Sequence, residues 1–206
     1  MSLFHEYICK TELSFFFWCK PENVPKTNRM TLYIPPLNLG MVINSSSDNK
    51  EVIYRSGFPQ PLNYPYIEET LNLKTIIYIG SEKTVTDEYK KFIEKNGYSF
   101  KVFEMSSVRD NDIHLKIKQI FELILNKENY PILIHSNKGK HRIGVITGLI
   151  RKVLLGWSIS GIYQEYGIYT GNIKGEMDLE FINNFDFGDM NVDFDIDLLP
   201  SYLNYL

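Results

Sequence analysis

The segment from Pro131 to Gly144, PILIHSNKGKHRIG, constrains the fold of this chain more than any other stretch. The apolar residues 132–134 predict a short buried strand, and a strongly apolar helix follows from Ile143. The polar turn between them holds a glycine and several basic residues. Backbone amides in such a turn, together with the N-terminus of the following helix, form a favourable site for an anion. The segment therefore predicts an α/β domain with an anion-binding loop.

Five residues separate Ser136 from Arg142, which is the spacing of the phosphate loop in cysteine-dependent phosphatases, with serine at the place of the cysteine. In those enzymes a thiolate attacks phosphorus, loop amides and the arginine hold the phosphoryl oxygens, and an acid protonates the leaving group. A serine hydroxyl ionises at much higher pH than a thiol, and a serine nucleophile needs an adjacent base. We therefore expect the loop to bind phosphate without forming a covalent intermediate. The residues expected to bind phosphate are Asn137, Lys138, Gly139, Lys140, His141 and Arg142.

No base for Ser136 is evident in the sequence. His135 precedes it in a predicted strand, so the two side chains are expected on opposite faces of the sheet. His141 lies between Lys140 and Arg142, whose charges disfavour proton uptake by the imidazole.

Other polar residues are candidates for the same cleft. Asp110 or Asp112, between a predicted strand and a predicted helix, is the candidate general acid, although polar loops commonly carry such residues. Arg55, at the end of another predicted strand, either reaches the cleft or makes a salt bridge. His5 and His114 lack metal-ligand spacing, and neither a metal nor another cofactor is expected.

The composition excludes several classes of protein. With 206 residues, 44% of them hydrophobic and 23% charged, the chain is expected to be globular, with one main domain. The formal net charge of −3 argues against a general nucleic-acid binder, so an anion site requires a local cluster of basic residues. Two cysteines are too few for a disulfide framework, and no apolar run approaches the roughly 20 residues of a membrane span. We expect a cytoplasmic protein that binds neither nucleic acid nor membrane.

Predicted strands and helices alternate along the chain, which indicates a central, mostly parallel sheet flanked by helices. Strands are expected at residues 51–56, 75–79, 98–105 and 132–134. Residues 59–65 contain three prolines and are expected to form a rigid turn. Helices are expected at residues 66–73, 87–96, 113–126 and 143–155. A further helix is expected to begin after a cap at Ser158 or Ser160, and the last helix is expected at residues 178–185. Gly97 is expected to end the second helix, and Gly144 and Gly148 to let the fourth approach the sheet closely.

Three regions are expected along the chain. Residues 1–29 hold both cysteines and an aromatic patch, and they are either an optional extension before Met30 or an ordinary arm packed on the domain. Residues 30–185 form the domain. Residues 186–206 form an acidic tail, because no lysine or arginine follows Lys174 while five aspartates occur. The tail is expected to be solvated, and a tail folded back on the basic loop is the alternative.

Several motifs occur in the order found in one phosphatase family. HSNKGKHRIG resembles the HCxxGKHRTG loop of the plant and fungal atypical dual-specificity phosphatases. Further stretches that resemble this family are YRSGFPQPLNYPYI, LKTIIYI, NYPILIH and GVITGLIRKVLLGWSISGIYQEY. The likeness covers residues 33–185 and is greatest to the fungal branch of oxidant-induced cell-cycle arrest proteins, which includes a member with serine at the cysteine position. The resemblance implies a compact fold like that of the tyrosine and other cysteine phosphatases.

The resemblance also assigns roles to individual residues. It implies that active relatives cleave phosphate from inositol pyrophosphates or phosphotyrosine. Arg142 matches the phosphate-binding arginine, Lys138 and Lys140 match basic loop positions, and Ser136 matches the nucleophile. Ile143 replaces the hydroxyl residue that assists departure of the thiolate. The resemblance thus implies that reaction chemistry is lost while the phosphate site remains.

Three functions are compatible with the sequence. The first is a pseudophosphatase, a catalytically impaired phosphatase-like protein that binds an inositol pyrophosphate or a phosphoprotein and assembles with related phosphatase-like proteins. The second is a weakly active phosphatase that uses Ser136 or direct attack by water. The third is a structural subunit whose loop is a relic.

Overall fold

The computed structural model describes residues 33–45, 50–171 and 175–203. They belong to one compact unit that begins at Tyr33. The expected N-terminal extension, residues 1–29, lies outside the described residues, and so does Met30.

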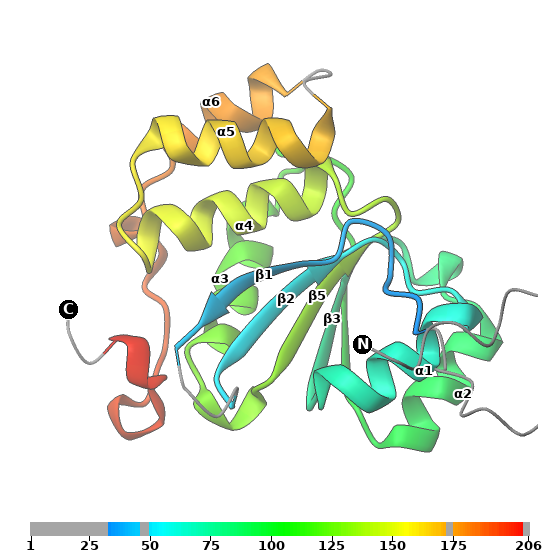
Figure 1. The fold of residues 1–206 in the computed structure, drawn as a ribbon. Helices are drawn as coiled ribbons and strands as arrows, with labels where there is room; N and C mark the ends of the chain where they lie inside the picture. The colour runs from blue at the N-terminus through cyan, green and yellow to red at the C-terminus, as the bar shows by residue number, and fades with distance from the viewer. Residues whose placement is uncertain (1–32, 46–49, 172–174, 204–206) are drawn as a thin grey trace, which may run out of the picture. The chain divides into compact units, whose positions relative to one another are not determined.

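A five-stranded sheet forms the centre of this unit, in the order β1-β2-β5-β3-β4 (Figure 1). The strands are β1 (Gly40–Asn44), β2 (Val52–Ser56), β3 (Thr75–Ile79), β4 (Ser99–Phe103) and β5 (Ile132–Ser136). β1 pairs antiparallel with β2, and all other pairs are parallel. The expected α/β fold with a mostly parallel sheet is confirmed, and β1 is an additional edge strand that the sequence pattern did not indicate.

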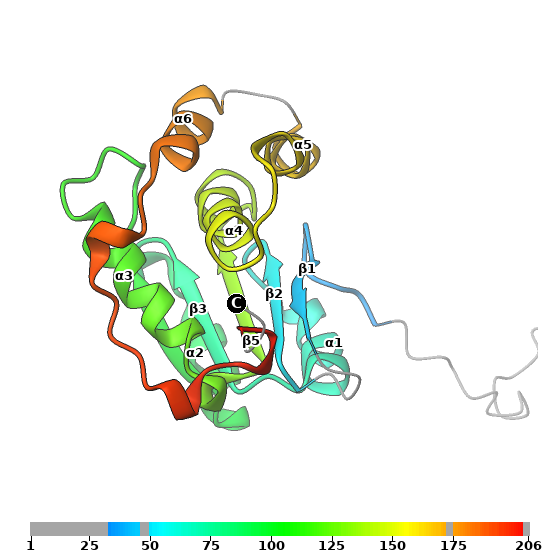
Figure 2. The ribbon, with the colours of Figure 1, turned by 90° about the vertical axis from the view of Figure 1, so that its left-hand side faces the viewer.

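Helices cover both faces of the sheet (Figures 1 and 2). On one face lie α3 (Ile113–Ile124) and α4 (His141–Val153), with α5 (Ile159–Thr170) and α6 (Glu176–Asn184) packed on α4. On the other face lie the short α1 (Tyr64–Tyr66) and α2 (Asp87–Asn96). None of the described helices is both long enough and apolar enough to cross a membrane.

β3 is an interior strand covered on both faces, which explains why its sequence, TIIYI, is almost entirely apolar. Ile77 and Ile79 belong to the core on the side of α3 and α4, whereas Ile76 and Tyr78 belong to the core on the side of α2. Successive side chains of a strand point to opposite faces, so a sheet covered on both faces requires an unbroken apolar run.

The proline-rich segment 59–65 is not the rigid turn that we expected. Pro61–Asn63 forms a 3₁₀ helix, α1 follows directly, and a π-helical turn continues over Ile67–Leu71. Proline is tolerated in the first turn of a helix because the N–H that it lacks would have no partner there. The helical region therefore begins about five residues before the position expected from periodicity.

Two helix ends follow their capping signals. Gly97, at a φ of +67°, ends α2 as expected. Ser158 rather than Ser160 caps α5, because its side chain accepts a hydrogen bond from the N–H of Gly161 at 3.4 Å.

The glycines of α4 have a different role from the one predicted. A Cβ at Gly144 would lie 2.8 Å from the ring of Tyr166 on α5, and a Cβ at Gly148 would lie 2.7 Å from Ile182 on α6. The two glycines therefore admit the outer helices to α4, and not α4 to the sheet.

The C-terminal segment is packed on the domain, although the side chains of Asp186, Asp193, Asp195 and Asp197 are exposed. Its apolar side chains contact the core beside α3; they are Phe185, Phe187, Met190, Val192, Leu199, Tyr202 and Leu203. The hydroxyl groups of Tyr202 and Tyr130 are 2.8 Å apart, and Glu51 accepts a hydrogen bond from the N–H of Ser201 at 2.8 Å. These contacts lie where β2 and β5 begin, at the end of the sheet opposite to the basic loop. The tail is therefore not wholly solvated as expected, because its apolar side chains pack on the domain, and residues 186–203 do not fold onto the loop.

Candidate phosphate-binding site

The phosphate loop, residues 136–142, joins the end of β5 to the start of α4. β5 lies between β2 and β3 in the middle of the sheet. Ligands of open α/β sheets bind at the carboxyl ends of the parallel strands. The loop predicted from the sequence therefore occupies the expected place of a ligand site.

Three consecutive carbonyl oxygens of the loop accept hydrogen bonds from other segments. The pairs are Asn137 O with Phe58 N (3.2 Å), Lys138 O with Asn38 Nδ2 (2.8 Å), and Gly139 O with Arg55 Nη2 (3.0 Å). In a trans peptide the N–H points away from the carbonyl oxygen of the same peptide plane. The N–H groups of residues 138–140 therefore point to the inside of the loop, and none of them donates to another described residue.

The start of α4 extends this set of donors. Lys140 is the N-cap residue, and no side chain caps this end of the helix. The first N–H groups of a helix have no intrahelical partner, and the helix dipole favours negative charge beside them. Residues 138–143 thus carry a continuous series of N–H groups without a partner among the described residues, which suits a phosphoryl group.

At this position any residue other than Gly139 would displace its neighbours. Its φ is +66°, and a Cβ would lie 2.5 Å from the nitrogen of Gly57 and 2.7 Å from the carbonyl carbon of Ser56. The loop backbone therefore rests directly on the end of β2.

Arg55 supports the loop from behind. Its side chain is 1% exposed, and its guanidinium carbon lies 3.6 Å from the centre of the Tyr169 ring. Burial lowers the pKa of Arg55 to about 10, so the group remains charged at neutral pH. Nε and Nη1 are buried without a hydrogen-bond partner, and no carboxylate forms a salt bridge with Arg55 among the residues described. Of the two alternatives for Arg55, the structure excludes a salt bridge to these residues and places the side chain against Gly139.

Ser136 is buried beneath the loop, with 2% exposure, and has no adjacent base. Within the described ranges its hydroxyl makes no hydrogen bond to a histidine or a carboxylate. The His135 ring lies on the other face of the sheet, as expected, with Nε2 3.0 Å from the Tyr89 hydroxyl and the ring stacked on Tyr78. Burial lowers the pKa of His135 to about 3, so its imidazole is neutral at neutral pH.

His141, the first residue of α4, is held by a chain of hydrogen bonds. Tyr166 donates its hydroxyl hydrogen to Asp178, so the Tyr166 oxygen accepts from Nδ1 of His141, 2.8 Å away. Burial and the bond to Asp178 raise the pKa of Tyr166 well above its ordinary value. The chain leaves Nε2 of His141 for a ligand. Nothing in the sequence pattern indicated Asp178, because it approaches the loop only through the packing of α6.

The basic side chains of the loop are unpaired. Lys138 is exposed, Lys140 and Arg142 are partly exposed, and none of the three forms an ion pair with a described carboxylate. Arg142 Nη1 donates to the carbonyl of Met105 at 3.4 Å, which places Arg142 beside the segment that carries the candidate acids. A small pocket of about 220 Å³ lies between that segment and α4.

The two candidate acids are engaged in other interactions. Asp110 accepts hydrogen bonds from the N–H groups of Ser106 (2.7 Å) and Ser107 (3.2 Å), and Asp112 pairs with Lys116 at 2.7 Å. Burial opposes ionisation of Asp110, but these hydrogen bonds and the charge of Lys116 outweigh it and lower its pKa. A general acid must be protonated, so this shift disfavours that role for Asp110. No cluster of histidine, cysteine and carboxylate residues that would suit a metal occurs in the described part of the chain.

Comparison with known proteins decides the family. The sequence profile of the tyrosine phosphatase family matches residues 33–197, which is well over half of the chain. The chain belongs to the tyrosine phosphatase family. Within it, the tyrosine-protein phosphatase-like protein OCA2 of Saccharomyces cerevisiae is 49% identical over 154 residues, which are 75% of this chain and 76% of OCA2.

Solved phosphatase structures have the same fold. The core catalytic domain of the PP-IP phosphatase SIW14 from S. cerevisiae, in complex with citrate, superposes with a TM-score of 0.67 at 34% identity, over 76% of this chain and 90% of that domain. A cysteine-to-serine variant of P. aeruginosa TpbA, in complex with phosphotyrosine, has a TM-score of 0.50 at 17% identity, over 67% of this chain and 82% of TpbA. The second likeness concerns the fold alone. The expected phosphatase-like α/β fold is thus confirmed.

Proposed function

We propose that this chain is a catalytically impaired member of the tyrosine phosphatase family that binds a phosphorylated ligand through its phosphate loop. The observation that carries the proposal is the orientation of the loop. Three outside donors hold its carbonyls outward, so that the N–H groups of residues 138–140 and the start of α4 converge on the space above Ser136.

The catalytic parts are the ones that the site lacks. Ser136 has no neighbouring base, and Ile143 is apolar and buried where the resemblance expects a hydroxyl. The pKa of Asp110 is lowered, which disfavours the protonated form that a general acid needs. Anion binding requires none of these groups. The site is therefore better suited to hold a phosphoryl group than to transfer it.

The comparisons support a phosphorylated small molecule or a phosphorylated protein as the ligand. SIW14 is named a PP-IP phosphatase, and the TpbA variant with serine in place of cysteine was solved with phosphotyrosine. The latter indicates that in TpbA this change is compatible with occupation by a phosphorylated residue.

Calorimetry with a phosphotyrosine peptide and with an inositol pyrophosphate tests binding. Arg142→Ala is expected to weaken the bound probe about 10- to 100-fold, because charge-assisted hydrogen bonds contribute about 1.5–3 kcal/mol. Lys90→Ala, which removes an exposed positive charge on α2, serves as the control and is expected to change affinity less than twofold. Absence of binding by the unmodified chain, or equal effects of the two substitutions, would contradict the proposal.

Phosphate release separates this proposal from a weakly active phosphatase. The unmodified chain is expected to release no phosphate at high enzyme concentration. Ser136→Cys restores the nucleophile alone, so release by this variant would mean that only the thiolate is missing, and silence would mean that Ile143 and the acid segment also fail to support the reaction. Steady release by the unmodified chain that disappears in Ser136→Ala would favour the active alternative.

We also propose that the protein acts in the cytoplasm in a complex with related phosphatase-like proteins. Co-purification from cells tests this with the unmodified chain and with Arg142→Ala. Partners that depend on the loop support a ligand-dependent complex, whereas identical partners for both would favour a structural subunit with a relic loop.

A further inference from the structure

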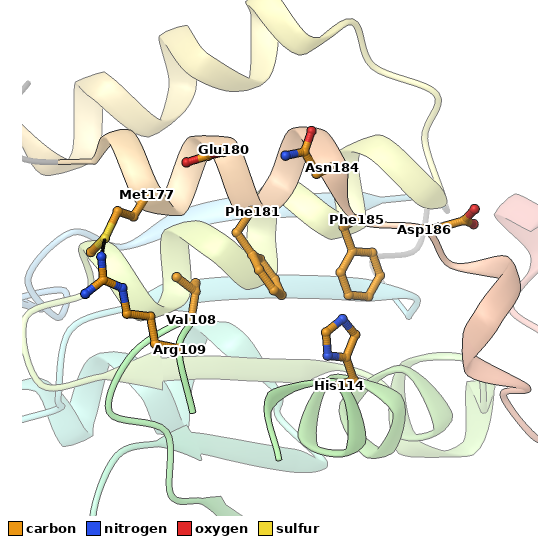
Figure 3. A pocket seen from close by; sticks show the side chains of 9 residues that line it. All are labelled: Val108, Arg109, His114, Met177, Glu180, Phe181, Asn184, Phe185 and Asp186. Carbon is orange, nitrogen blue, oxygen red and sulfur yellow. Dashed lines mark hydrogen bonds between the residues drawn. The ribbon is translucent and has the colours of Figure 1, made fainter. Parts of the chain in front are cut away.

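A second pocket, of about 470 Å³, lies beside the phosphate-binding site, between the start of α3 and α6 (Figure 3). Its volume lies within the range of about 300–1,000 Å³ found for ligand pockets. The residues that line it are Val108, Arg109, His114, Met177, Glu180, Phe181, Asn184, Phe185 and Asp186. None of them takes part in the phosphate loop, and the candidate phosphate site does not explain why this space is open.

α6 uses two different faces, one against α4 and one at the pocket. Ile182 is fully buried against α4, at the position where Gly148 admits it. Met177, Glu180, Phe181 and Asn184 follow the helical spacing of three and four residues, and this face of α6 points to the pocket.

Aromatic rings form the apolar lining. His114, an exposed residue of α3, stacks on Phe185 with the ring centres 5.6 Å apart and the planes at 7°. Phe181 lies 5.5 Å from Phe185 and 5.8 Å from His114. Such a surface offers apolar and ring contacts to a flat or branched side chain and few hydrogen bonds to a polar one.

The lining carries charges of both signs: the carboxylates of Glu180 and Asp186 attract a basic neighbour, while Arg109, beside Met177, attracts an anion. Glu180 and Asp186 are exposed, and Glu180 has no hydrogen-bond or ion-pair partner in the described segments. Asp178, two residues before Glu180 on α6, lines the smaller pocket of Arg142 instead. A ligand with phosphates on every side has no apolar part to place against the aromatic rings, and it would meet two carboxylates for the one guanidinium of Arg109.

The pocket is a neighbour of the phosphate site. Val108 lines both this pocket and the smaller pocket that contains His141 and Arg142. Along α6, the rise from Asp178 to Phe185 is about 10 Å, at 1.5 Å per residue. An extended peptide covers that distance in about three residues.

We infer that the α3–α6 pocket is a subsite for one large apolar side chain of a phosphorylated protein segment, placed about three residues from the phosphorylated residue and followed by a basic residue that pairs with Glu180. The inference rests on the proposed phosphate binding and names its ligand as a protein segment. The shared border at Val108, the aromatic lining and the unpaired carboxylate of Glu180 each match one part of such a segment.

Fluorescence anisotropy with full-length protein tests the subsite. The probes are phosphotyrosine peptides with Phe at the third position before or after the phosphotyrosine and Lys beside it, and the same peptides with Ala in place of Phe. We expect one Phe peptide to bind about tenfold more tightly than its Ala partner, as for a side chain seated in an apolar pocket. This preference is expected to fall below twofold in His114→Ala and in Phe181→Ala. It is expected to persist in Leu115→Ala, which truncates an exposed α3 side chain outside the pocket.

His114 is exposed, so its substitution leaves the test valid if Phe181→Ala fails to fold. Equal affinity for Phe and Ala peptides in the unmodified chain would overturn the subsite. Tight binding of an inositol pyrophosphate with no binding of any phosphopeptide would also overturn it and leave the proposed function standing. Failure of every phosphorylated probe would instead reject the proposed function.

Discussion

Replacement of Gly139 by alanine tests the architecture of the phosphate loop. The residue combines a left-handed backbone with contact to the backbone of another strand, since its φ is +66° and a Cβ would lie 2.5 Å from Gly57 N. Gly156, between α4 and α5, provides a matched control. Its φ is +63°, and a Cβ there would meet nothing within 4 Å.

The two substitutions share one energetic term and differ in another. A non-glycine residue in the left-handed region costs about 1–2 kcal/mol, and both variants carry this cost. Only in Gly139→Ala does the added Cβ also collide with backbone atoms of residues 56 and 57, which cannot rotate away as a side chain can. This overpacking costs about 1–3 kcal/mol more. Gly139→Ala is therefore expected to lower the free energy of unfolding by about 2–5 kcal/mol, and Gly156→Ala by about 1–2 kcal/mol.

Urea unfolding measures both values, and binding of a phosphotyrosine peptide adds a second readout. The loop must move away from β2 to accept a Cβ, so the hydrogen bonds that hold its carbonyls outward are lost. Gly139→Ala is therefore expected to lose peptide binding at temperatures where it is still folded, whereas Gly156→Ala keeps it. Equal losses of stability in the two variants, or unchanged binding by Gly139→Ala, would refute the packing argument.

Three further outcomes are expected. Arg55→Met removes the donor to the Gly139 carbonyl and a buried positive charge, so phosphopeptide affinity is expected to fall at least about tenfold. Arg55→Lys keeps the charge and is expected to retain part of the affinity, and equal losses in the two variants would count against a role for the charge. His135 stays neutral in the folded protein down to a pKa of about 3 but binds a proton near pH 6.5 when unfolded, so between these values the unfolded state holds more protons. The free energy of unfolding should therefore fall by up to about 1.4 kcal/mol per pH unit as the pH drops below 6.5, and urea titrations of His135→Gln should lack this part of the slope. Tyr202→Phe removes the hydrogen bond to Tyr130 and is expected to cost about 1 kcal/mol of stability without changing peptide affinity; weaker binding would contradict the placement of the tail at the far end of the sheet.

The sequence predicted those elements whose signal is local. The run TIIYI predicted β3, the periodic apolar positions predicted α2 and α3, and the coincidence of strand, glycine loop and helix predicted the phosphate loop. Each of these features is complete within about a dozen residues, so no knowledge of the rest of the chain was needed.

The features that were missed depend on distant partners. Asn38 and Phe58 help to orient the loop, but they lie some 80–100 residues before it and carry no periodic pattern. The tail was judged by its aspartates, whereas its irregularly spaced apolar residues decide where it packs. The α3–α6 pocket joins residues 108–114 to residues 177–186, and no local pattern in the sequence indicates that pairing.

The three donors that hold the loop carbonyls also determine when the site is formed as the protein folds. Asn38 and Arg55 lie 100 and 84 residues from their acceptors, so the candidate phosphate site depends on contacts between distant parts of the sequence. Closing such long loops precedes any gain from the contacts, which delays their formation. During synthesis the segment with Asn38 and Arg55 leaves the ribosome first, and its hydrogen bonds to the loop form only after β5 and α4 have also emerged. A C-terminal fragment that begins after residue 58 would contain the complete sequence motif but would not form the anion site, because the three donors that hold the loop carbonyls outward precede the fragment.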